Sequence, residues 1–169
     1  AAKMIAATLN LKTDKVKDPG FKDVSKNNWA YDSIATLANQ GIIVGYGNQF
    51  KPNDPLTRAQ LAKILTLSFK LQAGPLKDHR FTDVRPTDWY AGFVQPLIEK
   101  GITYGTTATT FSPDQAVNRG QIASFLYRSE LAVKETQVEG VITGITNEEV
   151  ATDKGTYTLS PELKAWINP

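Results

Sequence analysis

The chain repeats its own pattern, and this repeat constrains the fold more than any other feature of the sequence. A segment that begins at Phe21 returns with an offset of 60 from Phe81. The recurring residues are Phe21, Asp23, Val24, Trp29, Gly41, Ile42 and Gly45 and, after one inserted residue, Phe50, Pro52, Arg58, Gln60 and Ala62. Repeats of this length cannot bury an apolar face alone, so the pattern predicts repeats that stack and share a core.

Two complete repeats, residues 21–73 and 81–132, follow a partial one. Residues 1–11 match residues 61–71 with the same offset of 60, which makes them the last helix of a truncated first repeat. We therefore expect the natural protein to continue upstream with the other half of that repeat.

Each repeat is predicted to consist of a helix, a loop and a second helix. The first helix should carry one apolar stripe and end at Gly41, a usual place for a helix C-cap. The second should start at Thr57, because Thr57 and Gln60 have the spacing of a capping box, and Asn118 and Gln121 repeat this start. The apolar residues expected to face the core are Trp29, Ile34, Leu37, Ala38, Ile42, Leu61, Ile64, Leu65, Ile122, Phe125 and Leu126.

The composition changes in residues 136–169, which are rich in Val, Thr and Gly. Alternating apolar residues there predict short strands, with a hairpin turn at 153–155 and one or two helical turns at 161–167. The predicted fold is therefore mainly α, with a short β-rich C-terminal segment. The residues that suggest strands are Val138, Val141, Ile145, Val150, Tyr157 and Leu159.

Charge and composition exclude several classes of protein. Lys and Arg total 19 against 17 acids, too balanced for a nucleic-acid-binding protein, and no apolar run is long enough to insert in a membrane. The chain has no Cys and one His, His79, and it lacks a metal-ligand cluster, a phosphate-binding loop and a nucleophile motif. We expect no enzyme activity, no cofactor and no metal.

The combined motifs resemble the S-layer homology (SLH) family of bacterial cell-surface anchors, from residue 1 to about residue 131. The elements that carry the resemblance are Phe-x-Asp-Val, the Trp eight residues after the Phe, Gly-Ile, the Gly-containing loop, Phe-x-Pro and Thr57-Arg58-Ala59-Gln60. The family has Thr-Arg-Ala-Glu here, so Gln60 departs from it, and Asn118-Arg119-Gly120-Gln121 departs further.

The resemblance implies that three such repeats form a pseudo-threefold bundle with grooves between the lobes. It also implies that these grooves bind secondary cell wall polysaccharide, commonly one that carries pyruvate ketals, outside the cell at the wall. Self-association in a surface lattice is a further expectation, and neither nucleic acid nor a membrane is an expected partner.

Arg58 and Arg119 are the leading candidate ligand-binding residues. A cation at a helix N-terminus is disfavoured by about 0.3–1 kcal/mol, and both arginines lie at such a position. A bound carboxylate would remove the conflict, because guanidinium offers two parallel donors and the helix end adds amides. Alternatively, Arg58 pairs with Asp54 or extends into water. Arg58 has the better helix start, so we expect it to contribute more than Arg119.

The other candidates each have a structural alternative. Trp29 and Trp89 could stack on sugar rings or anchor the core. Asp23 and Asp83 could bind sugar hydroxyls or cap the turn before the first helix. Glycines could admit a ligand to the backbone or supply the positive φ of a loop. The glycines concerned are Gly45, Gly47 and Gly105.

Three functions remain open at this stage. The first is a non-covalent wall anchor for an S-layer-type protein, and the second is the anchor region of a surface glycoside hydrolase. The third is a helical-repeat module that binds another protein through an exposed apolar patch.

Overall fold

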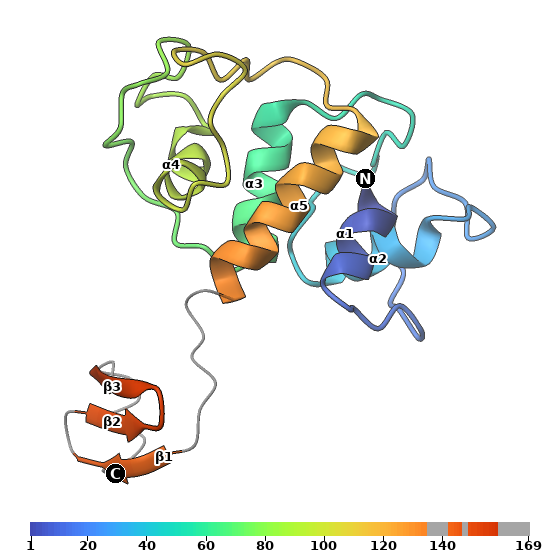
Figure 1. Ribbon diagram of the computed structural model, residues 1–169. Coiled ribbons are helices and arrows are strands. Elements are labelled where there is room, and N and C mark those ends of the chain that lie inside the picture. The colour runs from blue at the N-terminus through green and yellow to red at the C-terminus, as the bar shows by residue number, and fades with distance from the viewer. Residues whose placement is uncertain (135–141, 147–148, 159–169) are drawn as a thin grey trace. The chain divides into compact units, whose positions relative to one another are not determined.

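The computed structural model describes residues 1–134, 142–146 and 149–158. The protein is mainly helical with a small sheet near the C-terminus, which confirms the predicted fold class (Figure 1). Contacts divide it into two compact units, Ala1–Val133 and Lys134–Pro169, which are described separately. The helices are α1 (Ala2–Thr8), α2 (Tyr31–Asn39), α3 (Arg58–Ser68), α4 (Ala91–Glu99) and α5 (Arg119–Lys134).

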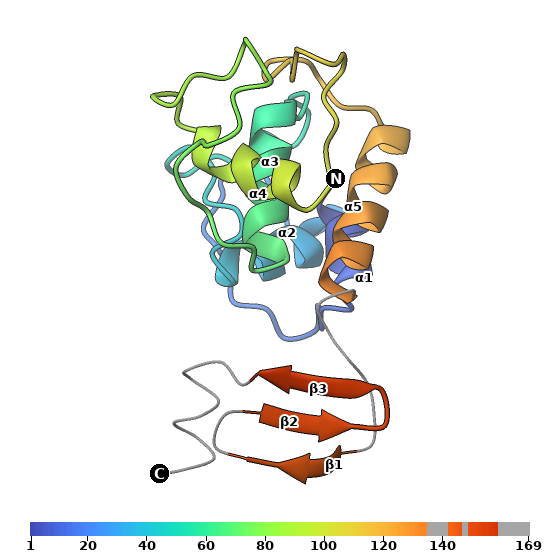
Figure 2. The ribbon, with the colours of Figure 1, turned by 60° about the vertical axis from the view of Figure 1, so that its left-hand side comes forward.

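Successive repeats contact each other through their helices. α1 packs against α2, the first helix of the next repeat (Figure 1), and α3 packs against α4 in the same way (Figure 2). The second helix of one repeat therefore supports the first helix of the following one, as expected for units that bury their apolar faces only by stacking.

The starts of α3 and α5 are capping boxes, as predicted. Thr57 Oγ1 accepts a hydrogen bond from the Gln60 amide (3.2 Å), and Gln60 Oε1 accepts one from the Thr57 amide (2.9 Å). Asn118 and Gln121 make the same two bonds at 2.9 and 3.0 Å. Two of the amides that a helix start leaves unpaired are thereby satisfied in each case.

The first helices end at the predicted glycine. Gly41 has φ +70°, and the next amide, that of Ile42, donates back to the Leu37 carbonyl at 2.9 Å. Gly101 and Ile102 repeat this ending in α4. A left-handed residue followed by this long backward bond is the Schellman motif, which glycine adopts without steric cost.

The prediction that Trp29 lies on the buried stripe of the first helix is wrong. α2 begins only at Tyr31, and Trp29 is 74% exposed. A turn precedes the helix, in which Asn28 Oδ1 accepts the Ala30 amide (2.9 Å) and the Asn28 carbonyl accepts the Tyr31 amide (2.8 Å). The turn replaces the helical geometry that the spacing assumed. Trp89, its counterpart, is also exposed.

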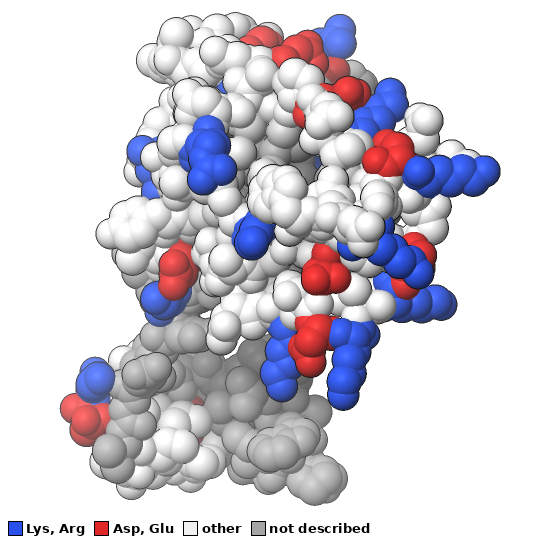
Figure 3. All heavy atoms as spheres, turned by 90° about the vertical axis from the view of Figure 1, so that its right-hand side faces the viewer, with Lys and Arg blue, Asp and Glu red and all other residues white. Residues whose placement is uncertain are grey.

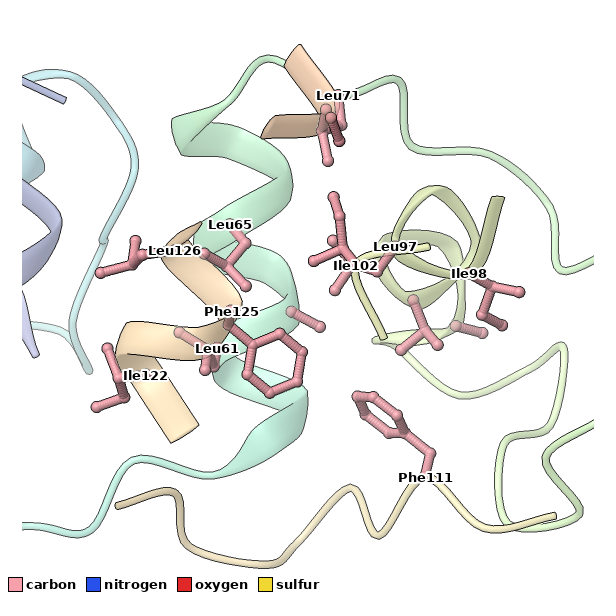
Figure 4. Close-up of a cluster of buried hydrophobic side chains, with 14 of the residues drawn as sticks. Leu61, Leu65, Leu71, Leu97, Ile98, Ile102, Phe111, Ile122, Phe125 and Leu126 are labelled. Carbon is pink, nitrogen blue, oxygen red and sulfur yellow. The ribbon is translucent and has the colours of Figure 1, made fainter. Parts of the chain in front are cut away.

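One apolar cluster joins the two complete repeats. Leu61 and Leu65 of α3 face Phe125 and Leu126 of α5, with Phe111 beside them (Figure 4). The burial predicted for Leu61, Leu65, Phe125 and Leu126 is thus confirmed. Because both second helices contribute, the cluster cannot form within a single repeat.

A pair of phenylalanines closes the loop of each repeat. The ring centroids of Phe21 and Phe50 are 5.7 Å apart, and those of Phe81 and Phe111 are 5.8 Å apart, with nearly equal tilts. Phe21 and Phe81 lie before the first helix of their repeat, whereas Phe50 and Phe111 lie in the loop after that helix. Their contact therefore joins the segment that leads into the first helix to the loop that leads out of it.

The second compact unit contains an antiparallel sheet in the order β1 (Ile142–Ile145), β2 (Glu149–Thr152), β3 (Gly155–Thr158). Thr152 pairs with Gly155, so the predicted hairpin turn is confirmed. The strand positions predicted for Ile145, Val150 and Tyr157 are confirmed too. The predicted strand residues Val138, Val141 and Leu159 and the helical turns at 161–167 lie outside the described residues.

Loop packing predicts different costs for two glycine substitutions. A Cβ at Gly105 would lie 2.5 Å from the Phe81 ring, and Gly105 has φ +81°; a Cβ at Gly47, with φ +63°, would meet nothing within 4 Å. We expect Gly105→Ala to lower the free energy of unfolding by about 3 kcal/mol, and Gly47→Ala by about 1 kcal/mol, since only the first adds overpacking to backbone strain. Urea denaturation measures both. Equal losses would contradict this packing.

Candidate functional site

A hollow of about 680 Å³ lies where the loop of the first complete repeat meets α1 and the starts of α3 and α5. Three exposed aromatic side chains line it: Trp29, Trp89 and Tyr46, which are 74%, 57% and 56% exposed. Large aromatic rings are usually buried, so three exposed ones around one hollow are a feature that folding does not require. This hollow is the candidate site, and we call it the groove.

Basic side chains surround the aromatic ones. Lys3 Nζ lies 5.6 Å from the centre of the Trp29 ring, and Lys51 Nζ lies 5.0 Å from that of Tyr46. The groove is lined by Lys3, Lys51, Lys63 and Arg119, against Asp54 as its one acidic residue among those described. On the face shown in Figure 3, Lys and Arg side chains stand next to Asp and Glu.

Arg119 lies at the start of α5 and faces this groove. Its side chain is exposed, and within the described residues it has no hydrogen bond or ion pair. The pKa of the Ala1 amino group is lowered, first by the partial burial of that amine and second by the nearby positive charge of Arg119. A free guanidinium at a helix start is available to a carboxylate.

Arg58, its counterpart, lies in the interior instead. It is 4% exposed, Nε donates to the Phe111 carbonyl at 2.6 Å, and the guanidinium lies 4.8 Å from the Phe111 ring centre and 5.2 Å from that of Phe125. Burial lowers its pKa, and nearby Asp83 partly opposes this shift. Neither structural alternative applies: Arg58 does not pair with Asp54, whose ion-pair partner is Lys51 at 3.9 Å, and it does not extend into water.

The two aspartates bind loop amides that are distant in sequence. Asp23 accepts from the amides of Phe50 (2.8 Å) and Lys51 (2.7 Å). Asp83 accepts from those of Phe111 and Ser112 at the same distances. The expected cap on the turn before the first helix is therefore replaced by a bridge from the segment before that helix to the loop after it. Neither residue lines the groove.

The three glycines adopt positive φ angles that their loops require. Gly47 has φ +63° and lies in the tight turn between Tyr46 and Gln49, whose backbones pair. Gly45 and Gly105 also have positive φ, with no room for a Cβ beside the phenylalanine ring of the same repeat. Of the three, only Gly45 lines the groove.

Sequence reasoning missed Tyr46, Lys3, Lys51 and Lys63 as lining residues. Tyr46 carries a recognisable signal, because it lies between Gly45 and Gly47 in a loop, where a large aromatic ring has no helix or strand to pack it. Its hydroxyl accepts a hydrogen bond from Gln60 Nε2 at 2.6 Å, which ties the loop to the start of α3. The lysines carry no such signal, since lysines are common at the surface of any protein.

Among the described residues, no group of three His, Cys, Asp or Glu side chains is placed to hold a metal ion. None of the helices in that part of the chain has the length and apolar character needed to cross a bilayer.

Stacked helix–loop–helix repeats, closed by an aspartate bridge and a phenylalanine pair, define a helical-repeat module. The chain belongs to the S-layer homology domain family, whose pattern matches residues 20–62 and 80–123. Domains of this family are non-catalytic anchoring domains, and membership indicates a location at the bacterial cell surface, in association with the wall.

Relatives include both surface-layer proteins and an enzyme. An S-layer protein of Bacillus thuringiensis subsp. finitimus is 33% identical over 132 residues, which cover 77% of this chain and 16% of that protein. The S-layer protein sap of Bacillus anthracis is 32% identical over the same shares. An endoglucanase of Bacillus sp. (strain KSM-635) is 33% identical over 140 residues, 79% of this chain and 15% of the enzyme. The chain thus spans about a sixth of these relatives' length.

The interior position of Arg58 predicts a structural role for its side chain. Arg58→Ala should lower the free energy of unfolding by about 2–4 kcal/mol, because it leaves the Phe111 carbonyl without its donor and a gap between two rings. Arg58→Met should cost less, since it fills the gap and removes a buried charge whose Nη2 has no partner. Urea denaturation compares them. Unchanged stability in Arg58→Ala would contradict the role.

The aspartate bridge predicts a loss of stability in acid. Amide hydrogen bonds, first that of Phe50, hold the pKa of Asp23 below its usual 3.8. A lowered folded-state pKa stabilises the protein above pH 3.8, and the contribution disappears as pH falls through the folded value. Asp23→Asn should lower the melting temperature at pH 7 and weaken its dependence on pH below 3.8. Parallel pH profiles for the two proteins would contradict this.

Proposed function

We propose that the groove binds an anionic, pyruvylated secondary cell wall polysaccharide and so anchors the chain non-covalently to the wall. The observation that carries the proposal is the pairing of exposed aromatic rings with cations, Trp29 with Lys3 and Tyr46 with Lys51, around one hollow. A sugar that bears a carboxylate has an apolar ring face and a charge, and this lining offers a partner for each.

The chemistry assigns a different role to each kind of side chain. The indole of Trp29 is a flat surface on which a sugar ring can lie. Lys3 beside the Trp29 ring and Lys51 beside the Tyr46 ring can each pair with a carboxylate carried by a sugar that lies on the neighbouring ring. Arg119 adds a guanidinium to the lining of the groove. Arg58 has no place in this binding site, because its guanidinium is enclosed by protein.

The charge of the groove favours a polysaccharide ligand over a protein partner. A surface that binds an apolar protein face would be expected to lack charges at its centre, whereas four cations line this one. The proposal includes no catalysis in this chain. Its cargo is of the S-layer type, with a glycoside hydrolase as the alternative that the endoglucanase relative suggests, and lattice self-association remains part of the proposal.

The test is co-sedimentation of the protein with purified Gram-positive cell walls, intact or stripped of their secondary polysaccharide. We expect binding to intact walls only. Trp29→Ala should weaken it by a factor of about 2–10, which corresponds to the loss of one aromatic contact. Tyr104→Ala is the matched control, because Tyr104 is 63% exposed but does not line the groove, and it should bind like the original chain.

Three other outcomes of this experiment would contradict the proposal. Equal binding to stripped walls would assign recognition to peptidoglycan and overturn the polysaccharide proposal. Absence of binding to either preparation would favour the protein-interaction module. Equal weakening by Trp29→Ala and Tyr104→Ala would show that the groove is not the binding surface.

A further inference from the structure

The hydroxyl of Tyr46, in the lining of the groove, is bonded to the side-chain amide of Gln60. Gln60 Nε2 lies 2.6 Å from the Tyr46 hydroxyl oxygen, and both residues line the groove. A phenol can accept a hydrogen bond or donate one, and a side-chain amide has one end for each role. The orientation of the Gln60 amide therefore decides what Tyr46 can offer to a ligand.

The start of α3 fixes that orientation. The Thr57 amide donates to Gln60 Oε1 at 2.9 Å, and a backbone N–H can bond only the oxygen end of a side-chain amide. The Gln60 amide donates in turn to Thr57 Oγ1, which closes the capping box. Turning the side chain over would place two donors against each other at Thr57. The NH2 end of Gln60 therefore faces Tyr46.

Tyr46 is left with a donor that the protein does not use. The NH2 group of Gln60 can only donate, so the Tyr46 oxygen accepts and its own hydrogen points away from Gln60. Among the residues that the structure describes, no acceptor receives this hydrogen. Because Tyr46 is 56% exposed and lines the groove, a bound molecule can reach it.

The position of this donor is set at both ends of the residue. The Tyr46 amide donates to the Gln49 carbonyl at 2.7 Å, and the Gln49 amide donates to the Tyr46 carbonyl at 3.2 Å. The backbone is thus held by the loop and the hydroxyl by α3. A group that is already fixed loses little conformational entropy when it binds a ligand, so it contributes more to affinity than a mobile one.

The second complete repeat has the same cap without the tyrosine. Gln121 Oε1 accepts from the Asn118 amide at 3.0 Å, as in the first repeat. The position of Tyr46 is occupied by Thr106, whose hydroxyl bonds that of Ser112 within its own loop. The pair of a capping glutamine and an exposed tyrosine hydroxyl is therefore particular to the first complete repeat.

We propose that Gln60 is a positioning residue that makes Tyr46 a hydrogen-bond donor to the ligand. The site would thereby select a sugar that presents an acceptor, such as a carboxylate, at the Tyr46 hydroxyl. The inference rests on the proposed function of the groove. Glutamate at position 60 would form the same capping box, but its second oxygen could only accept. Tyr46 would then give its hydrogen to the protein, and the ligand would lose a donor.

The first part of the test is co-sedimentation with intact Gram-positive cell walls. It compares the original chain with Gln60→Glu, Tyr46→Phe and the double variant. Tyr46→Phe should weaken binding about tenfold, as expected for the loss of one hydrogen bond to a charged acceptor. Gln60→Glu should weaken binding at least as much. In the Tyr46→Phe background its effect should be several-fold smaller, because only the added negative charge acts there.

Gln121→Glu is the matched control. It adds the same charge at the same position of the other capping box, and Gln121 does not line the groove. We expect this variant to bind like the original chain. Both glutamate variants should keep the fold, since glutamate completes a capping box as well as glutamine does.

The second part of the test needs no ligand. The Fermi doublet of tyrosine in the Raman spectrum depends on whether the phenol oxygen accepts or donates a hydrogen bond. The difference between each chain and its Tyr46→Phe counterpart isolates the contribution of Tyr46. We expect the pattern of an acceptor in the original chain and a change towards the pattern of a donor in Gln60→Glu.

The two parts separate the failure of this inference from that of the proposed function. Equal losses of binding from Gln60→Glu in both backgrounds, or an unchanged doublet, would overturn the role of Gln60. Undiminished binding by Tyr46→Phe would overturn the contact between its hydroxyl and the ligand. If the original chain failed to bind intact walls while the doublet changed as expected, the proposed function would be wrong and the orientation of the hydroxyl would be supported.

Discussion

The side chain of Arg58, enclosed by Phe111 and Phe125, is the contact on which the stacking of the two complete repeats depends. A cation at a helix start opposes the helix dipole, and burial adds to the cost, as the lowered pKa of Arg58 shows. The Phe111 carbonyl, two aromatic faces and the nearby Asp83 offset these terms. A directional contact thereby sets how the two repeats stack. Apolar burial alone would specify their arrangement less well.

The local features of this fold could be predicted from the sequence because their causes lie within a few residues. The capping box at Thr57 needs only Gln60, and the end of the first helix needs only Gly41. Burial of Phe125 and Leu126 follows from helical spacing. The prediction for Trp29 failed within the same range, because the turn centred on Asn28 ends the helical spacing before it reaches the tryptophan.

Which of the candidate residues form the site was less predictable, because several of them bind partners in distant segments. Asp23 binds amides 27 and 28 residues away, and Arg58 binds a carbonyl 53 residues away. The sequence shows that these residues recur but not what they contact. A recurring arginine is compatible with a ligand and with the next repeat alike, and only the positions of Phe111 and Phe125 distinguish the two for Arg58.

Recurrence and burial together separate stacking residues from binding residues. Phe21 and Asp23 recur, and their counterparts Phe81 and Asp83 make the same contacts, which account for the recurrence. Arg58 is enclosed by the next repeat, whereas its counterpart Arg119 is exposed. Tyr46 lines the groove but returns as Thr106, so the loops of the two repeats offer different chemistry to a ligand. The tryptophans recur and yet stay exposed at 74% and 57%. Packing does not explain a recurring exposed indole, whereas binding a repeating polymer would require the same surface in each repeat.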